Sequence, residues 1–199
     1  MSQKTIIDLM RHGEPVGGRR YRGQIDDPLS EKGWQEMRHA TSKESPWEVA
    51  ISSPLKRCSE FALELSNQLK IDLIHDDRLK EVGFGAWEGH SGDELRATDP
   101  NILNRFYHDP ITNRPTGAES LDSFSNRVQQ AFIDATSEHA GKHILMVTHA
   151  GVIRSILTHL LNAPLASMYR LSIGTATISR IEIDQERPPT IIFVSKTTP

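Results

Sequence analysis

The sequence has a single cysteine, no long hydrophobic run and no excess of positive charge. Because Cys58 has no partner for an internal disulfide, we expect a reducing, cytoplasmic environment and a small buried side chain rather than a reactive thiol. Apolar stretches such as Ile144-Leu145-Met146-Val147 are far too short to cross a bilayer, and no apolar signal segment precedes the first strand-like run. The formal net charge of −3 argues against a general nucleic-acid-binding protein. We therefore expect neither a membrane nor a nucleic acid as a partner.

Hydrophobic residues make up 37% and charged residues 25% of the 199 positions, which is the balance of a globular protein with a sizeable core. We find no internal repeat, low-complexity tract or linker, so residues 1–199 are expected to form a single domain. Positive charge is concentrated at one place, where Arg19, Arg20 and Arg22 crowd a short glycine-bearing loop. The sequence leaves the oligomeric state open.

Short β-rich runs alternate with segments of helical periodicity, which is typical of an α/β domain with a largely parallel sheet. The predicted strands are residues 6–10, 49–52, 71–74, 143–147, 175–183 and 191–194. The last two, separated by Arg187-Pro188-Pro189, are expected to form an antiparallel hairpin at one edge of the sheet. The expected fold is therefore a three-layer α/β/α sandwich with a mostly parallel sheet and an antiparallel edge strand.

Local signals mark where the helices begin. Ser30 is a candidate N-cap, and Ser53-Pro54 offers a cap followed by proline at the first helical position. Ser91-Gly92-Asp93-Glu94 fits a capping box, in which the cap and the third helical residue bond each other's backbone N–H groups. Two longer helices are expected over residues 121–139 and 151–161.

Two histidines are expected at the same edge of the sheet. His12 lies just past the end of the first strand, and His149 just past the end of the fourth. In open parallel α/β sheets, ligands bind at the carboxyl ends of the strands, so the pair indicates one site. The order strand, His149-Ala150-Gly151, helix also leaves backbone N–H groups at a helix start, where an anion can bind. Each histidine alone could be an ordinary polar residue at a strand end, but this alternative is weaker for the pair.

Two arginines accompany these histidines. Arg11 adjoins His12, and Arg57 falls in the first turn of the helix that follows the second strand. A planar guanidinium can hold two phosphate oxygens at once, so arginines that point into one pocket favour a phosphate site. Their charges also favour neutral imidazole, the form in which a histidine is nucleophilic. The alternative for Arg57 is a solvated residue on an amphipathic helix.

Six short blocks of sequence follow one another along nearly the whole chain. They are Leu9-Met10-Arg11-His12-Gly13-Glu14, Gly23 with Asp27-Pro28-Leu29-Ser30-Glu31-Lys32-Gly33, Ser52-Ser53-Pro54-Leu55-Lys56-Arg57-Cys58, Leu79-Lys80-Glu81-Val82-Gly83-Phe84-Gly85-Ala86-Trp87-Glu88-Gly89, Gly117-Ala118-Glu119-Ser120 and Val147-Thr148-His149-Ala150-Gly151-Val152-Ile153-Arg154. In this order they resemble the motifs of the histidine phosphatase superfamily, which includes the cofactor-dependent phosphoglycerate mutases. An Arg-His-Gly triplet alone occurs by chance in many proteins, whereas six ordered blocks make accident unconvincing.

The resemblance implies a role for each candidate residue. His12 would be the nucleophile that becomes phosphohistidine, and Glu81 would be the general acid for the leaving oxygen and then the base for water. Arg11, Arg57 and His149 would hold the phosphoryl oxygens and stabilise charge as the bond breaks. These roles suit phosphoryl transfer, which depends mainly on positioning and charge stabilisation. The alternative for Glu81 is a surface glutamate in a loop.

The mutase and phosphatase branches of the family differ between the acid-bearing loop and the Gly-x-Glu-Ser motif. The mutase branch has a long insertion there, with a lysine and adjacent arginines that grip phosphoglycerate. Here the path from Gly89 to Gly117 is short and its arginines are separated, which favours hydrolysis of a small phosphorylated metabolite. The run from Phe84 to Glu88 resembles the α-ribazole-phosphate phosphatases. Alternatives are phosphoglycerate mutase-type transfer and a non-catalytic module that binds a phosphorylated ligand.

We expect the enzyme to need neither metal nor cofactor, because its histidines are scattered and do not show metal-ligand spacing. One departure from the family follows the nucleophile. Many relatives have an asparagine six residues after it, where this sequence has Gly18. The neighbouring Arg19, Arg20 and Arg22 either replace its hydrogen bond to phosphate, contact a second anionic group of the substrate, or form a solvated loop.

Overall fold

The computed structural model describes residues 4–43, 45–184 and 186–197. Across these residues the β-strands form a sheet in the order β3-β2-β4-β1-β5-β6. The strands are β1 (Thr5–Arg11), β2 (Val49–Ser52), β3 (Asp72–His75), β4 (His143–Thr148), β5 (Ile178–Ile183) and β6 (Thr190–Lys196). β1 to β4 run parallel, whereas β5 is antiparallel to β1 and β6 is antiparallel to β5. The prediction of a mostly parallel sheet with an antiparallel edge is confirmed.

The predicted strands coincide closely with the observed ones, except that β5 begins at Ile178 and not at Thr175. Ala176 has a positive φ of 50°, and its N–H donates to the carbonyl of His12 at 3.2 Å. The Thr177 hydroxyl donates to the carbonyl of Gly174 at 2.9 Å. The segment therefore turns against the end of β1, and the alternating pattern wrongly predicted a strand there.

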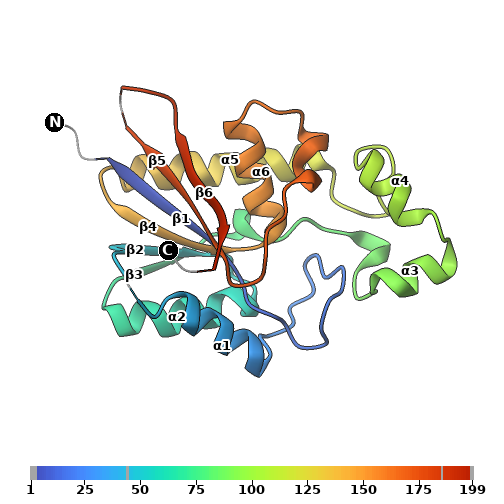
Figure 1. The fold of residues 1–199 in the computed structure, drawn as a ribbon, viewed down its shortest axis with the longest axis horizontal. Helices are drawn as coiled ribbons and strands as arrows, with labels where there is room; N and C mark the ends of the chain where they lie inside the picture. Colours follow the sequence, from blue (N-terminus) through green and yellow to red (C-terminus); the bar gives the residue numbers. More distant parts are fainter. Residues whose placement is uncertain (1–3, 44, 185, 198–199) are drawn as a thin grey trace.

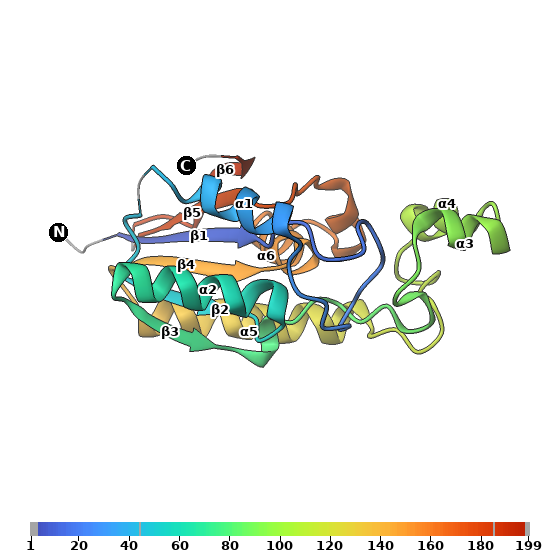
Figure 2. The same cartoon turned by 90° about the horizontal axis from the view of Figure 1, so that it is seen from below.

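Helices cover both faces of the sheet. They are α1 (Glu31–Ala40), α2 (Lys56–Leu69), α3 (Gly92–Thr98), α4 (Ile102–His108), α5 (Leu121–Glu138) and α6 (Ala150–Leu160), with the 3-10 helices η1 (Asp77–Leu79), η2 (Gly85–Trp87) and η3 (Leu165–Arg170). Figures 1 and 2 show α1 and α2 on one face and α5 and α6 on the other, which confirms the three layers. Both figures place α3 and α4 beyond the carboxyl ends of the strands. Among the residues described, no helix combines the length and apolar character needed to cross a bilayer.

Two of the three predicted helix caps are confirmed. The Ser30 hydroxyl accepts a hydrogen bond from the first turn of α1, and Ser91 and Glu94 form the capping box of α3. The prediction of Ser53 as a cap is wrong, because α2 begins only at Lys56 and has no side-chain cap. The Ser53 hydroxyl accepts from the N–H of Leu55 at 3.3 Å, just before the helix, and lies 2.8 Å from His149 Nε2.

The central strand β4 divides the hydrophobic core into two layers. Ile144 and Met146 pack into the cluster formed with α5 and α6, whereas Leu145 and Val147 pack into the cluster formed with α1 and α2. All four side chains are fully buried. Burial of each large apolar side chain contributes roughly 1.5–3 kcal/mol, so a strand that is apolar on both faces is stable only between two helical layers.

The strand order brings the carboxyl ends of β1 and β4 together. After β1 the chain crosses to β2, toward the β3 edge of the sheet, whereas after β4 it crosses to β5, toward the β6 edge. A reversal of this kind between neighbouring parallel strands is where open α/β sheets bind ligands. Arg11 is paired with Thr148 in the sheet register, so the next residues, His12 and His149, leave the sheet side by side.

Asp8 of β1 is the centre of a buried ion-pair network. Its carboxylate accepts hydrogen bonds from Arg180 at 2.7 and 2.8 Å, from Trp47 at 2.8 Å and from His143 at 3.0 Å. Burial raises the Asp8 pKa, but these donors outweigh burial and hold the pKa below its ordinary value. The carboxylate therefore contributes stability that is present above the unfolded-state pKa and is lost as the pH falls through the lower folded-state pKa.

We predict that Asp8→Asn lowers the free energy of unfolding at pH 7 by about 3 kcal/mol, because it removes the charge that pairs with the half-buried Arg180. The deficit should shrink as the pH falls below about 4, where Asp8 of the unfolded wild-type chain becomes protonated before the folded carboxylate does. Urea denaturation at pH 7 and pH 3 measures both effects. Asp93→Asn, which breaks an exposed pair with Arg96, is the control and should change stability little. A deficit that does not depend on pH would contradict the role of the Asp8 charge.

Candidate active site

The structure brings the two predicted histidines together. The ring centroids of His12 and His149 lie 5.2 Å apart, with the ring planes at 63°. Both side chains are buried. His12 follows β1 and His149 precedes the first residue of α6, so the parallel pairing of β1 and β4 is what places two distant parts of the sequence in contact.

The backbone fixes which ring nitrogen of His12 carries the proton. Nδ1 lies 2.7 Å from the carbonyl oxygen of Gly13. Because a carbonyl only accepts, Nδ1 must donate, which leaves the lone pair of the neutral ring on Nε2. A Cβ atom at Gly13 would lie 2.3 Å from the carbonyl oxygen of Gly33, so glycine is needed for this backbone approach. The geometry thus leaves the lone pair of Nε2 free of this backbone contact.

Both histidines are held in the neutral form. Burial lowers the His12 pKa well below its ordinary value, and the positive charges of Arg11 and Arg57 lower it further. Burial likewise lowers the pKa of His149, and Arg57 adds to the effect. The expectation that neighbouring cations favour neutral imidazole agrees with this direction, although burial is the larger cause. At neutral pH, His12 has an unprotonated nitrogen.

Of the two predicted arginines beside these rings, Arg57 is buried and Arg11 is partly buried. Arg57 is 1% exposed and donates to the carbonyls of Ile25 at 2.6 Å and Gly23 at 2.8 Å, so it is not a solvated helix residue. Arg11 donates to the carbonyl of Ile173 at 2.6 Å. Burial lowers the Arg11 pKa to about 10, which still leaves the side chain charged at neutral pH. The Nε atoms of both arginines are buried and have no hydrogen-bond partner among the described residues.

His149 contacts one side chain of the connection between β2 and α2 and one side chain of α2. The Ser53 hydroxyl lies 2.8 Å from its Nε2, and the Cys58 sulfur lies 3.6 Å from the same atom. Burial raises the pKa of the Cys58 thiol, which agrees with the prediction of an unreactive buried cysteine. Sequence reasoning missed the contact of Ser53, because its place before a proline indicated a helix cap.

Glu81 is held at the start of α6 beside His149. One carboxylate oxygen accepts from the Val82 N–H at 2.9 Å, and the other accepts from the Gly151 N–H at 3.2 Å. A Cβ atom at Gly151 would lie 2.2 Å from Glu81 Oε1, so glycine allows this contact. The expectation that the helix start leaves its N–H groups open to an anion needs correction, because Glu81 occupies one of them. Glu81 is not a surface glutamate with free oxygens.

Arg127 of α5 fastens the backbone around Glu81. Its guanidinium forms a bidentate pair with Glu119, at 2.7 and 2.8 Å. Glu119 Oε2 also accepts a hydrogen bond from the N–H of Gly83 at 3.1 Å. Arg127 also donates to three backbone carbonyls, those of Arg78 (2.6 Å), Lys80 (2.8 Å) and Glu81 (3.2 Å). Sequence reasoning missed this residue; the signal was a charged residue beside the apolar face of a helix.

The arginine-rich loop is largely occupied by contacts within the protein. Arg22 is buried and donates to Asp27 at 2.9 Å and to the carbonyl of Val16 at 2.6 Å. Arg20 donates to the carbonyl of Gly89 at 2.7 Å, and its ion pair is with Glu94 at 3.2 Å. Arg19 is exposed, and its charge helps to lower the pKa of Arg11. Two of the three arginines of the loop, Arg20 and Arg22, are therefore engaged within the protein, whereas Arg19 faces solvent.

Gly18 adopts a left-handed conformation in this loop, with φ of 70°. A Cβ atom there would meet no other atom within 4 Å. The position at which many relatives carry asparagine is therefore spacious but conformationally restricted to residues that tolerate a positive φ. No group of three or more His, Cys, Asp or Glu side chains in the described ranges is arranged to hold a metal ion.

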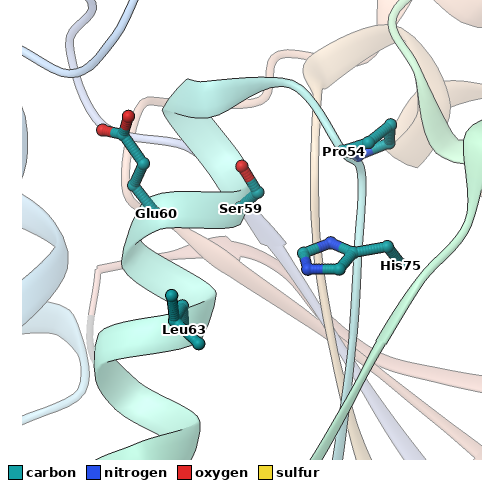
Figure 3. A pocket seen from close by; sticks show the side chains of 5 residues that line it. All are labelled: Pro54, Ser59, Glu60, Leu63 and His75. Atoms are coloured by element: carbon teal, nitrogen blue, oxygen red, sulfur yellow. The ribbon is translucent and has the colours of Figure 1, made fainter.

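A surface depression of about 220 Å³ lies beside α2, next to the end of β3. Figure 3 shows the side chains that line it. It is lined by Pro54, Ser59, Glu60, Leu63 and His75. None of the five predicted site residues is among them, so this depression is separate from the histidine and arginine cluster.

Comparison with known proteins identifies the family. The model of the histidine phosphatase superfamily (branch 1) matches residues 7–194. Phosphoserine phosphatase 1 of Hydrogenobacter thermophilus is 30% identical over 185 residues, covering 90% of this chain and 87% of that protein. The bifunctional protein Rv2228c of Mycobacterium tuberculosis is 31% identical over 198 residues, covering 97% of this chain but 54% of that protein. The chain thus spans about half the length of some curated relatives that it matches.

Among solved structures, Bacillus stearothermophilus YhfR superposes with a TM-score of 0.86 at 27% sequence identity, covering 96% of this chain and 97% of that chain. The family match therefore extends over the strands, helices and loops that carry the candidate site. The chain belongs to the histidine phosphatase superfamily (branch 1), a family of phosphatases and phosphoryl-transfer enzymes.

Proposed function

We propose that the protein is a phosphomonoesterase that hydrolyses a small phosphorylated metabolite through a phosphohistidine intermediate on His12. The observation that carries this proposal is the neutral His12 ring, oriented by the carbonyl of Gly13 and flanked by Arg11 and Arg57. A neutral nitrogen can attack phosphorus, and fixed guanidinium groups can bind the phosphoryl oxygens without reorganising.

In the first step, His12 Nε2 attacks phosphorus and the bond to the substrate oxygen breaks. Glu81, in its protonated form, gives its proton to that leaving oxygen. Arg11, Arg57 and His149 hold the three phosphoryl oxygens and stabilise the charge that develops on them. The Arg57 contacts with Ile25 and Gly23 keep its guanidinium in place during the reaction.

In the second step, water attacks the phosphohistidine and the phosphorus–nitrogen bond breaks. Glu81 is now a carboxylate and takes the proton from water, which restores its protonated form. The products are inorganic phosphate and neutral His12. The roles of these side chains require no metal ion and no cofactor.

One observation favours hydrolysis over mutase-type transfer: the segment between η2 and α5 holds only the two short helices α3 and α4. The names of the relatives do not decide the question, because they include both a phosphoserine phosphatase and a probable phosphoglycerate mutase. A non-catalytic phospho-ligand binding module is disfavoured because the chain keeps both the nucleophile, His12, and the acid, Glu81. Interconversion of phosphoglycerates faster than phosphate release would favour the mutase instead.

We predict that the wild-type protein releases phosphate from an aryl phosphate at the same rate with and without a chelator. His12→Ala should lower kcat by at least about 10⁴-fold and abolish acid-labile labelling, because the covalent intermediate cannot form. His75→Ala, at an exposed position at the end of β3, is the control and should retain activity and labelling. Labelling that survives His12→Ala would refute its role as nucleophile.

Glu81→Gln should slow hydrolysis of alkyl phosphates by about 10²- to 10⁴-fold, because glutamine cannot protonate a poor leaving oxygen. The loss should be smaller for an activated aryl phosphate, whose leaving oxygen needs little protonation. Steady-state kinetics on both substrate types measure the difference. An equal loss on both would argue against a general acid.

Arg127→Gln should also slow hydrolysis of alkyl phosphates more than that of aryl phosphates, because the backbone carbonyls of Lys80 and Glu81 lose their common donor. We expect kcat on alkyl phosphates to fall by about 10- to 100-fold, with a smaller loss on aryl phosphates. Arg38→Gln, which breaks a bidentate pair with Glu64 (both contacts 2.8 Å) on the surface, is the matched control. A loss that is equal for both substrate types would indicate general destabilisation only.

A further inference from the structure

The helix that carries Arg57 has no N-terminal cap of its own. α2 begins at Lys56, and the residue before it, Leu55, forms no side-chain hydrogen bond to the first turn. The first N–H groups of a helix have no partner within the helix, so they need one from elsewhere. Arg57 is the second residue of this turn, so any movement of the helix start displaces a predicted phosphate ligand.

A carboxylate from another part of the chain supplies the missing cap. Asp26, in the connection between β1 and α1, accepts a hydrogen bond through Oδ1 from the backbone N–H of Lys56 at 2.7 Å. Asp is among the most favourable capping residues, and its negative charge interacts favourably with the N-terminal end of the helix dipole. The start of α2 is therefore stabilised by a contact that the local sequence around it does not reveal.

The backbone beside Asp26 holds the Arg57 side chain. The carbonyls of Gly23 and Ile25 accept from Nη2 and Nη1 of Arg57 at 2.8 and 2.6 Å. Together with the cap, three hydrogen bonds join this segment to the first two residues of α2. We refer to residues 22–27 as the capping loop.

The capping loop is also closed on itself. The Ile25 N–H donates to the carbonyl of Arg22 at 2.9 Å, and the Arg22 side chain pairs with Asp27 at 2.9 Å. Arg22 is buried and donates as well to the carbonyl of Val16 at 2.6 Å. These contacts hold the loop in one conformation, which keeps the Asp26 carboxylate and the two carbonyls at fixed positions relative to one another.

Arg57 depends on this support because it is a buried cation. Both of its Nη atoms bond carbonyls of the capping loop, and its Nε has no hydrogen-bond partner among the described residues. Burial lowers the pKa of Arg57, whereas the negative charge of Asp26 is one of the influences that raise it. The capping loop thus supplies the hydrogen bonds of the guanidinium and part of the negative charge that favours its charged form.

We propose that Asp26 is a positioning residue for Arg57, which caps α2 and thereby fixes the guanidinium that binds the phosphoryl group. A donor that is already in place stabilises the transition state without reorganising, so the cap contributes to phosphate binding and to rate. This inference rests on the proposed function, because it takes Arg57 as a phosphate ligand. The competing role of Asp26 is a cap that adds stability and leaves the site unaffected.

Asp26→Ala should weaken the binding of inorganic phosphate about tenfold and lower kcat/KM for an aryl phosphate by a similar factor. Titration calorimetry and steady-state kinetics measure the two effects. Ser91→Ala is the matched control, because it removes the cap of α3, a helix that carries none of the five candidate residues. Urea denaturation should show a loss of stability in both variants, whereas only Asp26→Ala should change phosphate binding and kcat/KM.

Asp26→Asn keeps an oxygen that can accept from the Lys56 N–H and removes only the charge. It should bring phosphate affinity and kcat/KM to within about threefold of wild type, because Asn caps helices as well as Asp and the Asp26 charge is exposed to solvent. A loss as large as that of Asp26→Ala would show that the capping hydrogen bond does not position Arg57, and would overturn the proposal.

A double-mutant cycle tests whether the effect passes through Arg57. In an Arg57→Gln background, Asp26→Ala should lower kcat/KM by less than about twofold, because the side chain that it positions is absent. A further tenfold loss in that background would contradict the positioning role. The comparison of Asp26→Asn with Asp26→Ala remains decisive even where Arg57→Gln folds poorly.

The proposed function and this inference can fail separately. Unchanged phosphate binding and kcat/KM in Asp26→Ala, beside an impaired Arg57→Gln, would overturn the positioning role alone. No phosphate release by the wild-type protein would refute the proposed function, and calorimetry with inorganic phosphate would still test the effect of Asp26. Absence of both phosphate release and phosphate binding in the wild-type protein would refute the two together.

Discussion

The structure depends on the burial of positive charge at the point where β1 and β4 end. Arg57 is almost fully inaccessible to water, and Arg11 is buried deeply enough for its pKa to fall to about 10. A buried guanidinium is stable only where carbonyls or an anion replace water. The carbonyls of Gly23, Ile25 and Ile173 meet part of this need and thereby order the loops around the site. Burial lowers the pKa of both neighbouring imidazoles, and the same charges lower it further, so the buried cations and the neutral rings share one cause.

The acid side of the site is built differently, from contacts to the backbone. Glu81 lies in a connection between η1 and η2, where a chain without support would move, yet both its carboxylate and its carbonyl are bonded. Arg127 of α5, which pairs with Glu119, donates to the Glu81 carbonyl, and the N–H of Gly151 in α6 donates to the Glu81 carboxylate. The phosphate side thus relies on strand ends and the acid side on helices.

Much of the fold follows from local pattern. The parallel strands are short apolar runs between helical segments, and burial on both faces explains why β4 is apolar from Ile144 to Val147. The errors have local causes as well. The residue types from Thr175 to Thr177 alternate as in a strand, but the backbone turns there. The turn forms because the Ala176 N–H donates to the carbonyl of His12. Ser53 has the sequence context of a helix cap, yet its hydroxyl serves His149, a residue that local pattern cannot place beside it.

The sequence by itself determined the family, the α/β architecture and the identity of the five candidate residues, because these depend on residue types in ordered motifs and on hydrophobic periodicity. Their catalytic roles stay predictions. Only the tertiary structure decided that His12 donates through Nδ1, that Glu81 occupies the start of α6 and that Arg127 fastens the acid loop. It also decided that Arg22 faces inward and pairs with Asp27. The physical reason is that hydrogen bonding and charge burial depend on which distant segments come into contact, and that contact is set by the packing of the whole sheet and its helices.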